Sequence, residues 1–178
     1  CSIVDNYQLF YVDLWGVVHN GISLHKEAIK ALKEITKKGK EYILLTNAPR
    51  PNNVVKNFLR KMGMDEDILQ HVFTSGEASL SYLKKNLMNK NFFHVGPPRD
   101  IDLFKDFEEM KSIQIEDAEY IICTGLFEER EEDLKYYKEL FEKNLKKKMI
   151  CTNPDLIVDR GNKSCLLYTS PSPRDKSS

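Results

Sequence analysis

The chain has 178 residues, of which 41% are hydrophobic and 30% charged, a balance typical of a water-soluble globular protein with a buried core. Basic and acidic residues number 27 each, so the net charge is zero and argues against nucleic acid or a membrane surface as partner. No apolar run is long enough to cross a bilayer and no signal peptide is recognisable, so we expect a cytoplasmic location. The cysteines show no metal-ligand spacing.

Short apolar runs alternate with amphipathic stretches along the first half of the chain, a pattern that predicts βα units and a parallel sheet. The first run ends at Asp13. The second is continuous and is expected to be buried throughout; it ends at Thr46 and Asn47. Strands are predicted at 9–12, 41–45 and 71–73, and helices at about 26–38 and 51–62.

The same alternation continues to residue 151. Strands are predicted at 92–95, 120–123 and 149–151, and helices at about 78–87 and 129–146. We place a domain boundary near Gly76, because the polar groups of interest before it all fall at strand ends of one sheet.

Several of these polar groups can act together on phosphate. Ligands of an open parallel sheet bind beyond the carboxyl ends of its strands, and a carboxylate at the position of Asp13 can attack phosphorus to form an aspartyl-phosphate. Gly16 allows backbone N–H groups to converge on an anion, Thr46 and Asn47 offer a hydroxyl and an amide, and Arg50 adds positive charge. A single aspartate after a strand is more often a cap or turn residue, so the combination carries the inference.

Residues 11–21 resemble the first motif of the haloacid dehalogenase superfamily, and residues 44–51 resemble its second. Residues 74–78 fit the class IIA (NagD-like) branch, which includes phosphatases of small phosphorylated metabolites. Residues 94–97, 124–126 and 153–155 resemble landmarks of that branch's cap. The resemblance implies an α/β fold with a Rossmann-like parallel-sheet core, incomplete here, and an inserted α/β cap domain. The implied division is 1–76 core, 77–152 cap and 153–164 return toward the core.

The resemblance also implies the role of each matching residue. Asp13 would be the nucleophile and, with the backbone carbonyl of Trp15, a Mg²⁺ ligand. Asn153 and Asp155 would face the substrate at the junction with the cap. The implied substrate is a small phosphorylated metabolite, and a homo-oligomeric state is left open. The phosphate-binding set comprises Leu14, Trp15, Gly16, Thr46, Asn47 and Arg50.

One position departs from the usual pattern of the superfamily. Most of its phosphatases carry a second aspartate two residues after the nucleophile, as general acid and base, and here that position is Trp15. An indole cannot exchange a proton at a useful pKa. A tryptophan here fits an uncharacterised subgroup of class IIA. His19 is the nearest replacement in sequence, although an ordinary loop histidine is the commoner case.

Three functions therefore stay open. The first is a Mg²⁺-dependent phosphatase that forms an aspartyl-phosphate, and the alternative is a non-catalytic phosphometabolite-binding protein that has lost acid–base chemistry. A dehalogenase is a weaker third option, because that branch typically has a different cap. Residues 165–178 resemble a translated sequencing adapter. The family's third-motif lysine and fourth-motif acidic ligands would lie beyond that point, so we expect the chain alone to be inactive and poorly stable.

Overall fold

The computed structural model of the chain describes residues 2–87, 89–130, 133–153, 157–160 and 163–166. For Ser2 and for the strands after residue 153, only the backbone is described. Asp155 and residues 167–178 of the predicted adapter-like segment lie outside this part of the chain.

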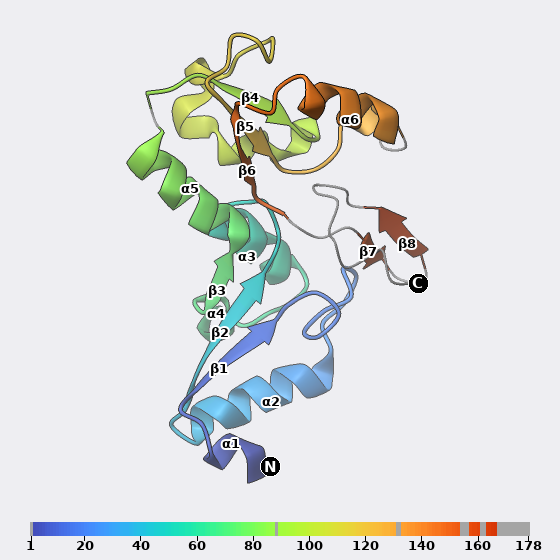
Figure 1. Cartoon of the computed structure of the whole chain (residues 1–178). Coiled ribbons are helices and arrows are strands. Elements are labelled where there is room, and N and C mark those ends of the chain that lie inside the picture. Colours follow the sequence, from blue (N-terminus) through green and yellow to red (C-terminus); the bar gives the residue numbers. More distant parts are fainter. Residues whose placement is uncertain (1, 88, 131–132, 154–156, 161–162, 167–178) are drawn as a thin grey trace.

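The first sheet has three parallel strands in the order β1-β2-β3, with bounds β1 Leu9–Asp13, β2 Glu41–Thr46 and β3 Val72–Thr74. A short helix, α1 (Ser2–Asp5), precedes β1. The strands are connected by α2 (Lys26–Lys37), α3 (Asn52–Lys61) and α4 (Glu66–Leu69). Figure 1 shows this sheet with α2 and α3 in one half of the molecule. The predicted βα alternation is confirmed here.

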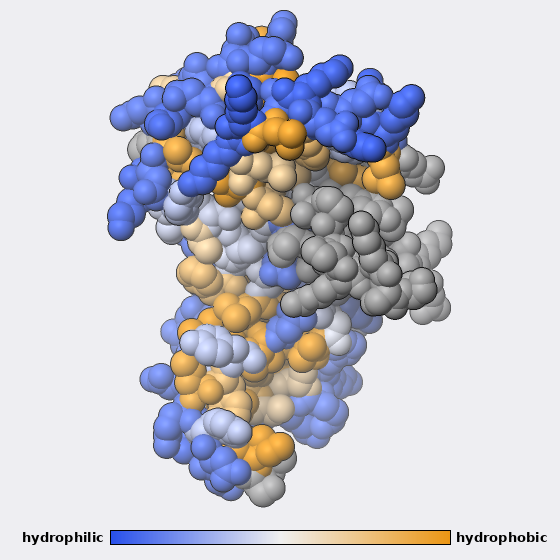
Figure 2. Space-filling model, in the orientation of Figure 1, coloured by the Kyte–Doolittle hydropathy of each residue, from blue (hydrophilic) through white to orange (hydrophobic). Residues whose placement is uncertain are grey.

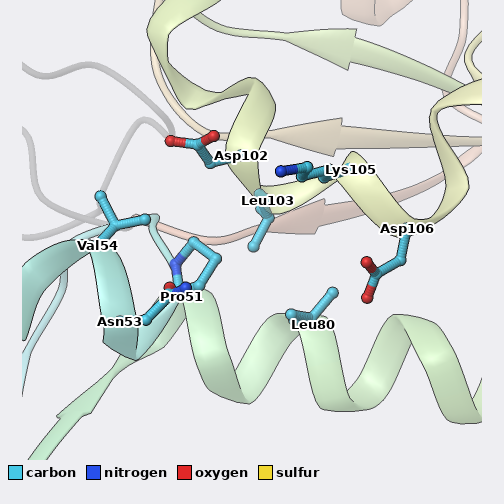
Figure 3. Close-up of a pocket in the computed structure, with 8 residues that line it drawn as sticks. All are labelled: Pro51, Asn53, Val54, Leu80, Asp102, Leu103, Lys105 and Asp106. Carbon is cyan, nitrogen blue, oxygen red and sulfur yellow. The ribbon is translucent and has the colours of Figure 1, made fainter.

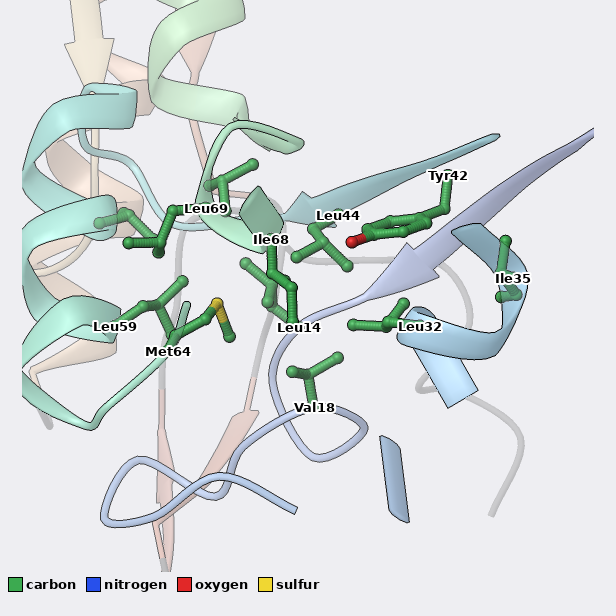
Figure 4. Packing of buried hydrophobic residues seen from close by; sticks show 12 residues of the cluster. Leu14, Val18, Leu32, Ile35, Tyr42, Leu44, Leu59, Met64, Ile68 and Leu69 are labelled. Carbon is green, nitrogen blue, oxygen red and sulfur yellow. The ribbon is translucent and has the colours of Figure 1, made fainter. Parts of the chain in front are cut away.

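One hydrophobic core joins this sheet to its helices (Figure 4). Alternate residues of β2 point into it, because successive strand side chains face opposite sides of a sheet: Tyr42 and Leu44 are buried, while Leu45 is 37% exposed. Helix α2 supplies Leu32 and Ile35. Burying a side chain such as Leu44 contributes roughly 1.5–3 kcal/mol. Further buried members are Leu14, Val18, Val55, Leu59, Met64, Ile68, Leu69 and Val72.

The opposite face of the first sheet carries exposed apolar side chains. Leu9, Tyr11, Leu45 and Phe73 are 38%, 67%, 37% and 43% exposed. Figure 2 shows apolar residues gathered on this half of the molecule. The prediction that 41–45 is buried throughout is therefore wrong for the described chain. In this part of the chain the helices cover one face of the sheet, and a continuous apolar run does not show which of its residues face the helices.

The second sheet is also parallel, in the order β4-β5-β6, with bounds β4 Phe92–Val95, β5 Tyr120–Cys123 and β6 Lys148–Cys151. Helix α5 (Ser75–Asn86) leads into it from β3. All four residues of β5, the central strand, are buried. The connections are the 3₁₀ segments η1 (Pro98–Leu103), η2 (Lys105–Met110) and η3 (Glu128–Arg130), together with α6 (Leu134–Glu142). Figure 1 shows this sheet in the other half of the molecule.

The helix predicted over 129–146 is shorter in the structure. Helix α6 begins after Asp133, whose side chain accepts a hydrogen bond from the Tyr136 amide at 3.0 Å, as an N-cap residue does. It ends at Glu142, and the Asn144 side chain then donates to the Leu140 carbonyl at 2.9 Å. Leu145, an apolar residue within the predicted helix, is 80% exposed.

Two short strands close the described chain. β7 (Ile157–Arg160) pairs with β8 (Lys163–Leu166) in an antiparallel ladder that aligns Asp159 with Ser164. Among the residues that the structure describes, no helix combines the length and apolar character needed to cross a membrane.

Candidate active site

Asp13 and Thr46 lie at the carboxyl ends of neighbouring strands. Asp13 is in register with Leu45, and Thr46 is in register with Thr74 of β3. The Asp13 side chain is exposed, and its Oδ1 accepts a hydrogen bond from the Leu14 amide at 2.9 Å. That amide also donates to the Leu45 carbonyl at 3.0 Å. The register thus brings the two principal predicted residues to the same edge of the first sheet.

A turn-rich loop follows Asp13 and carries the next predicted site residues. Gly16 adopts a left-handed φ of 78° and donates its amide to the His19 carbonyl at 2.8 Å. Asn20 Oδ1 accepts from the amides of Ile22 and Ser23 at 3.0 and 2.9 Å, which is the asparagine-stabilised turn expected of this residue type. The amides of Leu14 and Gly16, both predicted phosphate contacts, are therefore engaged by protein oxygen atoms.

Trp15 packs within this loop. Its ring lies over Gly21, where an added Cβ would come within 2.7 Å of Trp15 Cη2. The indole meets the His19 ring edge-on at 5.2 Å between centroids, and His19 meets Phe58 of α3 at 6.0 Å. Aromatic pairs prefer this edge-to-face arrangement. Trp15 is thus a packed, half-buried side chain at the position where a proton-transferring carboxylate is usual.

His19 is also fixed in place. It is 4% exposed, and its Nδ1 accepts a hydrogen bond from the Gly21 amide at 3.0 Å. Desolvation by burial, helped by the charge of His25, lowers the pKa of His19 below its ordinary value. Because Nδ1 is the acceptor, the neutral tautomer carries its proton on Nε2. This environment is that of a structural histidine.

The loop after Thr46 is held from β3 and from the start of α5. Thr46 Oγ1 accepts from the Ala48 amide at 3.3 Å. The Thr74 hydroxyl donates to the Arg50 carbonyl at 2.6 Å, and the Ser75 hydroxyl donates to the Ala48 carbonyl at 3.2 Å. Asn47 is exposed at the tip of this loop. These contacts fix the backbone beside the strand-end edge of the sheet.

Arg50 contacts the part of the chain after Gly76 that builds the β4-β5-β6 sheet. This part is called the second unit, and the part up to Gly76 is called the first unit. Its Nε donates to Asp100 Oδ1 of η1 at 3.3 Å. Burial raises the pKa of the Asp100 carboxyl, against the lowering effects of its hydrogen bond to Thr124 and of the Arg50 charge. The structure therefore places the Arg50 guanidinium at the junction of the two units.

A second contact between the units involves the end of β6. The single proton of the Ser75 hydroxyl is shared between the Ala48 and Thr152 carbonyls, and the Thr152 hydroxyl donates to the Cys123 carbonyl at 3.2 Å. Asn153, a predicted substrate-facing residue, is 5% exposed, and its carbonyl accepts from the Cys151 thiol at 3.3 Å. Its predicted partner Asp155 lies outside the described residues.

A pocket of about 200 Å³ lies between the start of α3, helix α5 and the 3₁₀ segments (Figure 3). Pro51, adjacent in sequence to Arg50, lines it together with Asp102, two residues after Asp100. The remaining lining residues are Asn53, Val54, Leu80, Leu103, Lys105 and Asp106. Within the part of the chain that the structure describes, no three His, Cys, Asp or Glu side chains cluster as a metal site.

Comparison with known proteins identifies the family. The profile of the haloacid dehalogenase-like hydrolases matches residues 10–108, and the chain belongs to this family. That result confirms the family resemblance of the motifs around Asp13 and Thr46. Comparison with curated protein sequences gives no significant match.

Solved structures show the same fold. A haloacid dehalogenase-like hydrolase from Brucella suis 1330 is 30% identical, covers 93% of this chain and 63% of its own, and superposes with a TM-score of 0.81. A 4-nitrophenylphosphatase from Thermotoga maritima is 25% identical over 93% of this chain and 62% of its own, with a TM-score of 0.69. A putative NagD protein, 23% identical over 92% and 63%, has a TM-score of 0.67. The chain spans less than two thirds of the length of each.

Sequence reasoning missed Asp100 and its partner Arg50 as a contact between the two units. A weak local signal was present, since Asp100 follows Pro97, Pro98 and Arg99 just after a strand. Polar residues at that end of a strand are candidates for ligand or loop contacts. No spacing rule links two residues fifty positions apart.

Proposed function

We propose that this protein is a phosphatase that hydrolyses a small phosphorylated metabolite through an aspartyl-phosphate on Asp13. The observation that carries the proposal is the exposed Asp13 carboxylate at the end of β1, one register step from Thr46 on β2. The family membership and the likeness to a 4-nitrophenylphosphatase support the reaction class. We further propose that residues 77–152 act as a cap and that the protein works in the cytoplasm.

In the proposed reaction, a carboxylate oxygen of Asp13 attacks phosphorus and the bond from phosphorus to the ester oxygen breaks. The ester oxygen leaves with that electron pair and takes up a proton from solvent. Water then attacks the phosphorus of the aspartyl-phosphate, and the bond from phosphorus to Asp13 breaks, which releases inorganic phosphate and the free carboxylate. The Thr46 hydroxyl would hold a phosphoryl oxygen. The Leu14 and Gly16 amides have protein acceptors, and we propose the amides of Trp15 and Asn47 as further donors to the anion.

The residues present fit Mg²⁺ only as a site shared with substrate. Asp13 supplies one carboxylate and Trp15 one carbonyl, and Mg²⁺ is commonly held by one or two carboxylates together with substrate phosphates. When bound, Mg²⁺ would neutralise phosphate charge and align it for attack. We propose Asp13 and the Trp15 carbonyl as the ligands that this part of the chain contributes.

Trp15 gives the proposal a distinctive consequence for substrate preference. General acid–base assistance is typically worth about 10²–10⁴ in rate, and neither the indole nor the packed, neutral His19 is placed to supply it. Esters whose leaving group departs without a proton, such as 4-nitrophenyl phosphate, should therefore react much faster than alkyl phosphates with the same enzyme.

The test is turnover by the full-length gene product with Mg²⁺, using 4-nitrophenyl phosphate and a panel of alkyl phosphates. Asp13→Asn should abolish turnover. It should also abolish the increase in protein mass by one phosphoryl group that mass spectrometry detects in the wild type. Asp117 is a matched exposed carboxylate, and Asp117→Asn should retain both properties. The proposal fails if wild-type protein shows neither turnover nor phosphorylation across the panel.

A non-catalytic phosphometabolite-binding protein is the second candidate. The packing of Trp15 against Gly21 and His19 favours it, because the usual proton-transfer position is occupied by a fixed aromatic side chain. This candidate predicts binding of phosphate esters that is weakened by Thr46→Val, without any phosphorylation of Asp13. Wild-type turnover lost in Asp13→Asn would exclude it.

A further inference from the structure

In the described part of the chain, the side chain of Arg50 is held by Asp100. Its Nε donates to Asp100 Oδ1 at 3.3 Å, and the Arg50 side chain is 37% exposed while that of Asp100 is 4% exposed. An arginine presents five donors in a fixed planar fork. A bond through Nε engages one edge of the fork, and the edge between the two terminal amino groups is not the one that this bond uses.

Asp100 is itself supported by a polar row across the second sheet. A side-chain hydrogen bond joins it to Thr124, which follows β5. Thr124 Oγ1 lies 2.8 Å from Nε2 of His94, a buried residue of β4. Thr124 thus stands between Asp100 and His94, and the Asp100 carboxylate can only accept from it. The carboxylate therefore has little freedom to rotate.

The space around this row is tightly filled. An added Cβ at Gly96 would lie 2.1 Å from Thr124 Oγ1 and 2.7 Å from His94 Nε2. The charged groups that act on Asp100 are Arg50 and Arg99, both of which favour its ionised form. Arg99 is engaged elsewhere, through Nη1 to Glu128 at 3.0 Å. Arg50 is therefore the direct partner of the buried charge.

The backbone of Arg50 is held from the first unit. Thr74 donates to its carbonyl at 2.6 Å. Gly76 packs so closely that an added Cβ would lie 2.3 Å from the Arg50 nitrogen. Thus contacts with the first unit fix the backbone of Arg50, and the contact with the second unit fixes its guanidinium. Arg50 lies four residues after Thr46 in the sequence.

We propose that Asp100 is a positioning residue, which fixes the Arg50 guanidinium so that its terminal amino groups bind the anionic phosphate group of the substrate. The inference rests on the proposed function and adds to it that the second unit completes the anion site through Arg50. A guanidinium held through Nε keeps a two-pronged edge for phosphate oxygens. Asp100 thereby acts on the substrate only through Arg50.

The test compares Asp100→Asn with Asp102→Asn in the full-length gene product. Asp102 is the matched control, an exposed carboxylate two residues along the same 3₁₀ segment. Inorganic phosphate is the probe, and its affinity is measured by calorimetry. Asp100→Asn should weaken binding by about tenfold or more, since a hydrogen bond to a charged group contributes at least that factor, and Asp102→Asn less than twofold. The 4-nitrophenyl phosphate assay should show the same change in KM with a smaller change in kcat.

Double substitution shows whether Asp100 acts through Arg50. On an Arg50→Met background, Asp100→Asn should change phosphate affinity less than twofold. Additive effects would overturn the inference, as would unchanged affinity in Arg50→Met. Thr124→Val removes the hydroxyl behind Asp100 with little change of shape, and it should weaken phosphate binding in the same direction. This variant decides the question if Asp100→Asn does not fold.

A spectroscopic measurement separates this inference from the proposed function. In protein labelled with ¹⁵N-arginine, the Nε–H signal lost in Arg50→Lys belongs to Arg50. That signal should exchange slowly with water in wild type and in Asp102→Asn, and quickly in Asp100→Asn. If wild type binds no phosphate, the proposed function fails, and the positioning of Arg50 is still decided by this signal. An Arg50 signal unaffected by Asp100→Asn would overturn the inference even if phosphate binds.

Discussion

His19 Nδ1 accepts a hydrogen bond from the Gly21 amide at 3.0 Å, so the ring is anchored by the loop that it helps to shape. Because burial lowers the pKa of His19, the ring stays neutral near pH 7. A histidine that is anchored through one nitrogen and packed between Trp15 and Phe58 is suited to holding the loop and poorly suited to exchanging protons with substrate.

We therefore expect His19→Asn to retain activity within about threefold, because the Asn side-chain oxygen can accept from the Gly21 amide in place of Nδ1. A proton-transfer role would instead cost about 10²–10⁴ in kcat. His19→Leu is the matched variant without an acceptor. It should lower the free energy of unfolding by roughly 1–3 kcal/mol, because the Gly21 amide loses its partner. Kinetics and urea unfolding of both variants measure the two effects.

Gly21→Ala should destabilise the protein more than Gly39→Ala does. Both positions have a left-handed φ, 84° and 67°, which costs an alanine roughly 1–2 kcal/mol. Only at Gly21 would the new methyl group also meet the Trp15 ring, at 2.7 Å, whereas nothing lies within 4 Å at Gly39. Urea unfolding should show an extra loss of about 1–2 kcal/mol at Gly21. Equal losses at the two sites would contradict the Trp15 packing.

Gly76→Ala should be among the most damaging single substitutions. The new Cβ would lie 2.3–2.5 Å from backbone atoms of Arg50, which cannot move aside as a flexible side chain can. We expect a loss of about 3 kcal/mol in unfolding free energy. At Gly125→Ala, where the nearest atom is Pro97 Cδ at 3.3 Å, the loss should be near 1 kcal/mol. Thermal or urea unfolding of the pair checks the difference.

Acid should weaken the fold through His94. Desolvation by burial lowers its pKa to about 3 from 6.5. Below pH 6.5 the unfolded chain therefore binds a proton that the folded chain does not, and stability falls as the pH drops from 6.5 toward 3. At pH 5 this difference in proton binding lowers the free energy of unfolding by about 2 kcal/mol. His94→Gln, which keeps a donor for Thr124, should flatten this dependence of unfolding free energy.

Strands and helices that are bounded by glycine or proline residues were predictable from the sequence. Strands β4 and β5 occupy the predicted residues 92–95 and 120–123, because each is a short apolar run followed by a glycine within two residues. Helix α6 was predicted too long, since Leu134 and Leu145 extend an apolar pattern that the fold leaves largely exposed. The spacing of apolar residues indicates which side of a helix could be buried. It does not indicate how much of that side another element of the fold covers.

The candidate site was predictable in part for a similar reason. Asp13 and Thr46 follow strands that are consecutive in sequence, so parallel pairing brings them together. The contact between Arg50 and Asp100 depends on how two separate sheets meet, and no local pattern encodes that meeting. The engagement of the Leu14 and Gly16 amides depends likewise on the detailed path of the loop.

Each sheet joins strands that are consecutive along the chain, β1 to β3 within 9–74 and β4 to β6 within 92–151. A ribosome therefore releases the described strands β1 to β3 before the first strand of the second sheet. Contacts within each half are close in sequence and can form early, while Arg50 must wait for Asp100 to emerge. During synthesis, the ion pair between Arg50 and Asp100 can therefore form only after the strands of the first sheet are already available to fold.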